Sequence, residues 1–263
     1  MMKFKKFSVI AALALIFPFA CQQDETSLTE EVSDEALAKI SNLGFSTENV
    51  QRVDDGYLVE GDIILHDHDL AGPGKETKLR IAEVEQYHTF NVVSALPRVI
   101  TISVSGTVSS AFSTSVNNAI ARYNAENLGI TMQRVSSGGS INIRIVNTRQ
   151  YIASAGFPDS NGNPYPEIKY AKAYSSGYSD GFMTTVIAHE IGHCIGFRHT
   201  DYMNRAYSCG GSASNEGSGT VGAVHIPGTP TGPDPNSWML ACLGATTNRP
   251  FNANDKVALN YLY

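Results

Sequence analysis

Three histidines within eleven residues constrain this chain more than any other feature. They are His189, His193 and His199, in the segment "VIAHEIGHCIGFRHTD" at 186–201. Residues four apart on an α-helix project from nearly the same face, so His189 and His193 can present their imidazoles to one point. Gly196 allows the chain to leave the helix in a left-handed conformation that other residues disfavour. The spacing predicts a helix that ends near Gly196 and a turn that brings His199 back toward the first two.

Converging imidazoles at this spacing indicate a metal site. Three neutral imidazoles that leave a fourth position open are the ligand set of a catalytic zinc ion. Glu190 follows the first histidine, so its carboxylate would lie beside the ion, where it can hold a water molecule and accept its proton. The full pattern H-E-x-x-H-x-x-G-x-x-H fixes five positions and is far more specific than H-E-x-x-H alone. We therefore expect Zn²⁺ on the three histidines, with Glu190 as the catalytic base.

The motif resembles that of the metzincin superfamily of zinc endopeptidases. The wording "HEIGH" and the following "CIGFRHTD" are most similar to the bacterial HEIGH-motif metallopeptidases. The resemblance covers 97–263 and implies an α+β fold: a twisted mixed sheet, an active-site helix, and a C-terminal helix below a methionine turn. "NSWML" places Met239 forty residues after His199, and the resemblance implies that Met239 forms that turn. Thr200 matches none of the usual residues of the matrix-degrading, astacin and snake-venom branches, so their substrate preferences are not carried over.

The pattern from residue 96 onward is that of a compact domain. Alternating, β-branched segments predict strands in "RVITISVSG", "ITMQRV", "INIRIVN" and "EIKYAKAY". Helical spacing is present in "SSAFSTSVNNAIARYNAE", in the motif segment after a cap at Asp180, and in "ANDKVALNYLY". This order of elements indicates a mixed α+β domain. By resemblance to metzincins, "EIKYAKAY" would be the upper rim of the cleft and would pair with an extended peptide substrate.

The N-terminus has the pattern of an export signal. Lys3, Lys5 and Lys6 precede an apolar run that ends at Ala20, and Cys21 follows it. The segment "FPFACQQDE" resembles the lipobox of bacterial lipoproteins, with Cys21 as the lipidated residue, and the acidic residues after it resemble the surface-export signal of the Bacteroidetes group. The alternative is an ordinary secretory signal that is cut elsewhere. We expect the mature protein in the bacterial cell envelope, as an outer-membrane surface lipoprotein, or secreted, with the lipid as its only membrane contact.

Charge divides the exported chain into two parts. Residues 22–96 carry 16 acidic and 5 basic side chains, whereas 97–263 carry 9 acidic and 11 basic ones. Neither part has the clustered basic residues of a nucleic-acid binder, so no nucleic-acid partner is expected; we expect a monomer. The predicted organisation is a lipoprotein signal peptide at 1–20, an acidic tether at 21–35, a pro-segment or accessory module at 36–95, and a metzincin-like catalytic domain at 96–263.

The other cysteines would lie where disulfides persist, because the protein leaves the cytosol. Cys209 and Cys242 both lie in non-helical segments near the motif, and we favour them as the bonded pair. Cys194 lies within the motif helix, where a small buried apolar side chain is the commoner role. The sequence alone does not determine the connectivity.

The acidic part contains a second motif, "VEGDI". It resembles the aspartate-switch motif F-x-G-D of astacin pro-segments, with Val59 in place of the phenylalanine. The resemblance implies that Asp62 occupies the open metal position and keeps the enzyme silent until the segment is cut away. The other interpretation is a Gly-Asp turn between strands of a small module, which would make 36–95 a spacer or accessory unit. Cleavage within 71–98 would release the domain, at Lys78, Arg80 or Arg98.

Together these features predict a secreted or surface-anchored zinc endopeptidase, which hydrolyses peptide bonds with zinc-activated water and Glu190 as general base. The expected partner is a protein or peptide substrate, bound extended along the cleft. Two alternatives stay open: a zinc-binding surface protein without turnover, and a hydrolase of peptidoglycan crosslinks. The presence of Glu190 favours an enzyme over the first alternative. For the second, the sequence shows no cell-wall-binding module.

Overall fold

The computed structural model describes residues 31–54, 56–71, 86–218, 221–230 and 232–263. The expected signal peptide and Cys21 lie outside these ranges. No helix within them is long and apolar enough to cross a bilayer. The described chain forms two units, each with a hydrophobic core of its own, which we call the small unit (31–71) and the large unit (86–263).

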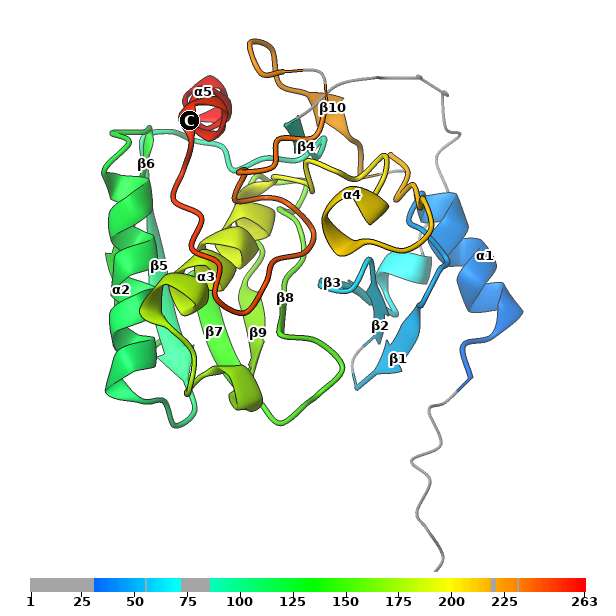
Figure 1. Ribbon diagram of the computed structural model, residues 1–263, viewed down its shortest axis with the longest axis horizontal. Coiled ribbons are helices and arrows are strands. Elements are labelled where there is room, and N and C mark those ends of the chain that lie inside the picture. Colours follow the sequence, from blue (N-terminus) through cyan, green and yellow to red (C-terminus); the bar gives the residue numbers. More distant parts are fainter. Residues whose placement is uncertain (1–30, 55, 72–85, 219–220, 231) are drawn as a thin grey trace, which may run out of the picture.

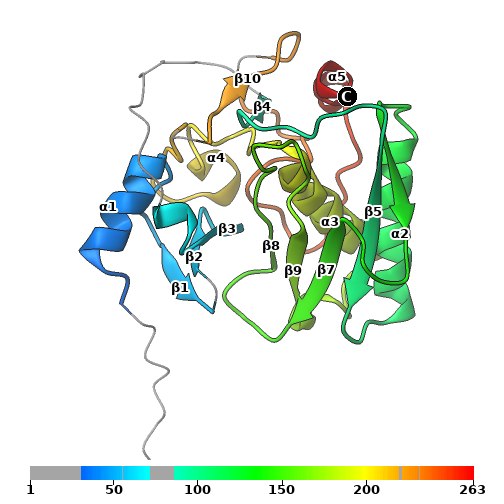
Figure 2. The ribbon, with the colours of Figure 1, turned by 180° about the vertical axis from the view of Figure 1, so that it is seen from behind.

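A five-stranded mixed sheet forms the framework of the large unit (Figures 1 and 2). Its order is β6-β5-β7-β9-β8, and all neighbours are parallel except β8, which pairs antiparallel with β9. The strands are β5 (Arg98–Ser105), β6 (Ile130–Arg134), β7 (Ile141–Val146), β8 (Ala153–Ser154) and β9 (Glu167–Ala171). Helices α2 (Ser110–Asn124) and α3 (Asp180–Ile195) lie on one face of the sheet. The mixed α+β class predicted from the sequence is confirmed.

The expected rim strand is not at the edge of the sheet. "EIKYAKAY" forms β9, which pairs with β7 on one side and β8 on the other. Its backbone groups are engaged on both sides, so the prediction that this strand pairs with substrate was wrong. The edge is β8, and its two residues are too few for alternation to be visible in the sequence.

Helix α3 carries the first part of the motif and is buried along nearly its whole length. All its residues from Phe182 to Ile195 are buried, which is why it lacks a polar face. Its cap is Ser179, whose side chain accepts a hydrogen bond from the N–H of Phe182 at 3.2 Å. Asp180, the cap expected from the sequence, is already the first helical residue. Both residue types can cap a helix, and the extended backbone of Ser179 decides between them.

The small unit pairs one helix with a three-stranded antiparallel sheet. Its elements are α1 (Asp34–Leu43), β1 (Gln51–Val53), β2 (Gly56–Val59), β3 (Ile63–His66) and the 3₁₀ turn η1 (Asp69–Ala71). Side chains such as Ile40, Phe45 and Leu65 form its core. Helix α1 begins at Asp34, within the range expected to be tether.

Contacts between the units centre on the start of β3. The N–H of Ile64 donates to the carbonyl of Ala155 at 3.0 Å, and the N–H of Ala155 donates to the carbonyl of Asp62 at 2.9 Å. Ile63 and Ala155 thereby form an isolated parallel β-bridge. Ala155 directly follows the edge strand β8. The small unit therefore occupies the only free edge on this side of the described sheet.

The described chain from residue 86 onward is already integrated into the large unit. Strand β4 (Tyr87–His88) pairs with β10 (Val224–His225), and the side-chain amide of Gln86 donates to Asp255 at 2.6 Å. The domain boundary predicted at residue 96 stays a prediction, but a cut there would remove β4. Of the proposed cleavage sites, Arg98 begins β5, inside the sheet, whereas Lys78 and Arg80 lie outside the described residues.

The chain after α3 is largely irregular and returns to the motif. It contains α4 (Ala206–Cys209) and ends in α5 (Ala253–Leu262), whose N-terminus has a complete capping box from Asn252 and Asp255. A disulfide joins Cys209 to Cys242, the pair favoured from the sequence, and Cys194 is a buried free thiol.

Candidate active site

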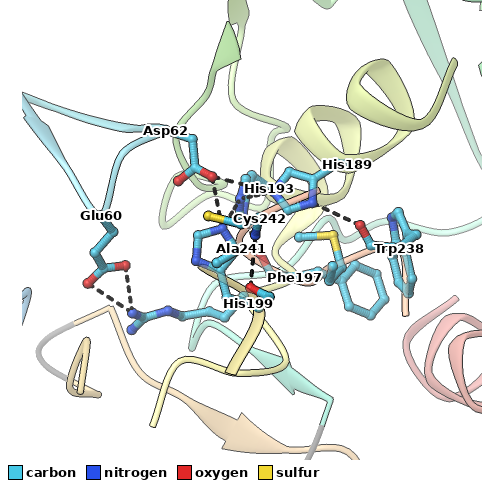
Figure 3. Close-up of polar contacts among 12 residues, drawn as sticks. Glu60, Asp62, His189, His193, Phe197, His199, Trp238, Ala241 and Cys242 are labelled. Carbon is cyan, nitrogen blue, oxygen red and sulfur yellow. Dashed lines mark hydrogen bonds and ion pairs between the residues drawn. The ribbon is translucent and has the colours of Figure 1, made fainter. Parts of the chain in front are cut away.

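The motif histidines meet at one point (Figure 3). His189 and His193 project from the last turns of α3, and Gly196 ends the helix at φ 115°. The chain then turns back, and His193 Nε2 lies 3.1 Å from His189 Nε2 and 3.2 Å from His199 Nε2. All three side chains are buried.

Hydrogen bonds to the Nδ1 atoms fix the orientation of the three imidazole rings. The Nδ1 atoms of His189 and His193 lie 2.9 Å from the carbonyls of Trp238 and Phe197, and Nδ1 of His199 lies 2.8 Å from Glu216 Oε1. All three partners are acceptors, so each Nδ1 carries a proton, and in the neutral form that binds a metal each ring would turn an Nε2 lone pair inward. Lone pairs so close together repel one another unless a cation lies between them. The donor set therefore fits a metal ion.

Asp62 reaches the same point from the small unit. Its Oδ2 lies 3.0 Å from His199 Nε2 and 3.6 Å from His189 Nε2. One atom from each of these four side chains fits within 4.8 Å of all the others, so the aspartate completes a ligand set (Figure 3). Asp62 also lies in the turn between β2 and β3, where Gly61 has φ 85°. The Gly-Asp turn of the one interpretation is therefore present, and it brings the Asp62 carboxylate to the histidines, which the other interpretation requires.

The histidines lie among buried carboxylates, which a cation would stabilise. Burial opposes a charge on His199, but the carboxylates of Asp62 and Glu216 outweigh it and raise the pKa of this ring well above its usual range. Burial likewise opposes the charge of Asp62, yet His199 and His189 hold its pKa well below its usual range. Two carboxylates at one buried point need positive charge nearby, and a metal ion would supply it.

Glu190 lies next to the metal ligands without a partner of its own. Its side chain is buried, and no described residue hydrogen-bonds to its Oε2. Burial, reinforced by the charge of Asp62, raises the pKa of Glu190 well above its usual range. A desolvated carboxylate with a free oxygen is suited to accept a proton from a nearby water.

Met239 packs beneath the ligand helix. It is fully buried, and its carbonyl accepts a hydrogen bond from the N–H of Thr200 at 3.0 Å. A Cβ on Gly192 would come within 2.5 Å of the Met239 sulfur, so this position has no room for a side chain. Gly192, the glycine of "HEIGH", was not predicted as a site residue. It packs directly against Met239, so these two features of the motif depend on each other.

A second pair of contacts ties the chain after His199 to the chain after Met239. Asp201 is buried, and its carboxylate accepts hydrogen bonds from the N–H of Ala241 at 3.0 Å and the hydroxyl of Ser208 at 2.5 Å. The Cys209–Cys242 disulfide lies beside these bonds. Together they hold the third histidine against the methionine turn.

A buried charge network extends from His199 to the small unit. Glu216 accepts from His199 and, at 2.7 Å, from Arg205, while Arg198 contacts both Glu216 and Glu60. Although burial opposes it, His199 and the two arginines lower the pKa of Glu216 to about 2. Burial and the charge of Glu216 raise the pKa of Glu60 well above its usual range, although the charges of Arg198 and His199 oppose this shift. This network was not predicted, because Glu60 lies 138 residues from Arg198 and Glu216 lies in an irregular segment 17 residues after His199.

Three histidines around one point, with a glutamate beside the first and a methionine below, define the metal centre of a metallopeptidase. The chain belongs to the Dual-action HEIGH metallo-peptidase family, which matches residues 61–263 and so includes Asp62. The family predicted from the motif is thereby confirmed, and the chain is an enzyme, which sets aside the alternative of metal binding without turnover.

Two solved structures of myroilysin are similar to this chain. One matches with a TM-score of 0.44 and 15% identity, over 65% of this chain and 82% of that chain. The other matches with a TM-score of 0.34 and 14% identity, over 60% of this chain and 56% of that chain. A search of curated proteins finds no match.

Proposed function

We propose that this metallopeptidase is a zinc endopeptidase with Glu190 as its general base. The observation that carries the proposal is the convergence of three Nε2 atoms whose rings are fixed by acceptors at Nδ1. Three imidazoles with a position left for solvent or substrate are typical of catalytic zinc. We propose that Asp62 takes that position in the intact chain, since one of its oxygens lies within 4.8 Å of a nitrogen of each histidine.

The roles of the side chains follow from their placement. A zinc ion bound by the three histidines would polarise the scissile carbonyl and lower the pKa of a water molecule. Glu190 accepts the proton of the attacking water and passes it to the leaving amine. The carbonyls of Trp238 and Phe197 and the carboxylate of Glu216 orient the imidazoles.

The edge at β8 is the proposed site for the substrate backbone. Ala155 offers one N–H and one carbonyl, which the intact chain uses to bind residues 62 and 64. An extended peptide that replaces this segment makes the same kind of main-chain bonds. We therefore place the substrate along residues 153–155 rather than along β9.

We further propose that the small unit keeps the enzyme latent. Support comes from the 3.0 Å contact of Asp62 with His199 and from the backbone bonds of the same turn to Ala155, which engage the metal site and the substrate edge together. Activation then requires a cut upstream of Gln86, so that β4 stays with the large unit.

The zinc proposal is tested by metal content and turnover. The full chain, with a protease recognition site inserted between 71 and 86, is folded intact, cut, and assayed on a peptide library with and without chelator. We expect about one zinc per chain, absent in His193→Ala. Glu190→Gln should keep the zinc and lose roughly 10²–10⁴-fold in activity. Glu167→Gln, which changes a partly exposed glutamate on β9, is the matched control.

An unchanged cleavage rate in Glu190→Gln would exclude this residue as the base. Full zinc retention in His193→Ala would remove the ligand assignment. Crosslinked peptidoglycan fragments, digested in parallel, test the remaining alternative, because cleavage of these and not of the library would change the substrate class.

We also propose that the protein is exported and lipidated at Cys21. The signal-like N-terminus supports this, and so does the Cys209–Cys242 disulfide, since such bonds persist outside the cytosol. Metabolic labelling with an alkynyl fatty acid should mark the wild-type chain and leave Cys21→Ser unmarked. Equal labelling of both chains would contradict lipidation at this residue.

A further inference from the structure

Arg198 is a buried cation that faces the small unit. It directly precedes the third histidine, and its Nη2 lies 3.3 and 3.1 Å from the two carboxylate oxygens of Glu60 (Figure 3). Both side chains are fully buried. Glu60 belongs to the same turn as Asp62, two residues before it, so one turn places one carboxylate at the metal ligands and another on this arginine.

Aromatic rings hold the guanidinium in place. Its central carbon lies 6.0 Å from the ring centre of Phe157 and 5.7 Å from that of Tyr202, both in the large unit. The small unit adds Phe45 at 5.5 Å. Arginine stacked in this way is pre-organised to bind a carboxylate. Two of the three rings belong to the large unit and stay in the chain with Arg198 when the small unit leaves.

The charges of the large unit do not balance at this place. Oε2 of Glu216 lies 3.7 Å from Arg198, beyond hydrogen-bond distance, while its Oε1 accepts from Arg205 and His199. Without the small unit, two arginines share one glutamate. Loss of the small unit thus leaves Arg198 without the carboxylate of Glu60, and a carboxylate of a bound peptide would take that place.

We propose that Arg198 is a specificity-determining residue that binds an acidic side chain of the substrate in the space that Glu60 occupies. The inference rests on the proposed function, since it requires peptides to replace the small unit. The turn then resembles a bound substrate in three respects: main-chain bonds to Ala155, an oxygen atom at the three histidines and a carboxylate on Arg198. The substrates are peptides with Glu or Asp within about two residues of the scissile bond, matching the separation of Glu60 and Asp62.

Cleavage specificity is the first test. The cut full chain is assayed on the library and on paired peptides that differ only by Glu or Gln near the scissile bond. We expect Glu and Asp to be enriched, and the Glu peptide to be cleaved at least about tenfold faster. In Arg198→Gln the ratio of the two rates should fall toward one. Arg144→Gln, which removes a partly exposed arginine on β7, should leave both the rate and the ratio unchanged.

Binding without turnover is the second test, and it does not need a folded Arg198 variant. A fluorescent peptide of residues 56–66 is titrated into the cut chain carrying Glu190→Gln, and anisotropy is measured. The Glu60→Gln peptide should bind at least about tenfold more weakly than the parent, and Glu60→Asp should lose less.

The outcomes separate the two proposals. Glu60-dependent binding without cleavage of any peptide supports the Arg198 site and contradicts the peptidase proposal. Cleavage without acidic preference contradicts the Arg198 proposal and leaves the peptidase proposal standing. Equal binding of the parent and Glu60→Gln peptides also overturns the role of Arg198.

Discussion

The acceptor on the third histidine differs from those on the other two. His189 and His193 donate to main-chain carbonyls, whereas His199 meets the carboxylate of Glu216 at 2.8 Å. A charged acceptor raises the basicity of the ring it binds and so strengthens that ring as a metal ligand. We therefore expect Glu216 to increase metal affinity through His199.

Glu216→Gln should weaken zinc binding about 10–100-fold. The amide oxygen can still accept from His199, so orientation is retained and the lost charge accounts for the change. Competition with a chelator on the folded chain measures the affinity, with Glu167→Gln as the control. Parent affinity in Glu216→Gln would show that the charge contributes nothing.

A second residue-scale prediction concerns the glycine of the motif. In Gly192→Ala the new Cβ would meet the Met239 sulfur at 2.5 Å, and overpacking of this kind costs about 1–3 kcal/mol. Gly244→Ala, whose Cβ meets only an ordinary contact at 3.4 Å, is the control. Denaturant unfolding compares the two variants. Equal stability would mean that Met239 moves aside without cost.

Sequence separation explains which site residues could be predicted. The three histidines and Glu190 lie in one segment, where helical geometry alone brings them together. Glu216 lies 17 residues from His199, and Glu60 lies 138 residues from Arg198, so only the tertiary fold shows these pairs. Asp62 was found through a motif, but its contact with the ligands could not be derived from spacing.

Element by element, long periodic segments were predicted best. Strands β5, β6 and β7 and helices α2, α3 and α5 lie where the patterns placed them. The two-residue strand β8 was missed, and with it the true edge of the sheet, because so short an element has no periodicity. The pairing order of strands is likewise set by packing rather than by any one segment.

The disulfide supplies an element-scale prediction. It links α4 to the segment after Met239, across 33 residues, so its loss should destabilise the chain by about 2–4 kcal/mol. The variant with Cys209→Ser and Cys242→Ser should unfold at lower denaturant. Reductant should lower the stability of the parent and leave that of the variant unchanged. A parent that is insensitive to reductant would contradict a structural role for this bond.

At the scale of the whole molecule, the turn between β2 and β3 joins the two units. It places Asp62 at the metal ligands and Glu60 on Arg198, and its backbone bonds to Ala155. All three contacts must be lost together when the small unit leaves. The N-terminal part is acidic and the catalytic part is nearly neutral, so their net charges permit this docking. Charge counts alone could not identify the residues that pair.

The most direct test is the peptidase rate of the zinc-loaded intact chain compared with that of the same chain after cleavage between 71 and 86. We predict that the intact wild type is at least about tenfold slower than the cut chain, because an oxygen of Asp62 lies among the three histidine nitrogens and would take the fourth ligand position of a bound metal. Intact Asp62→Ala should lie between them, since the small unit still covers Ala155, and intact Asp67→Ala, an exposed aspartate of the small unit, should behave as wild type. An intact wild-type chain as active as the cut one would contradict the account.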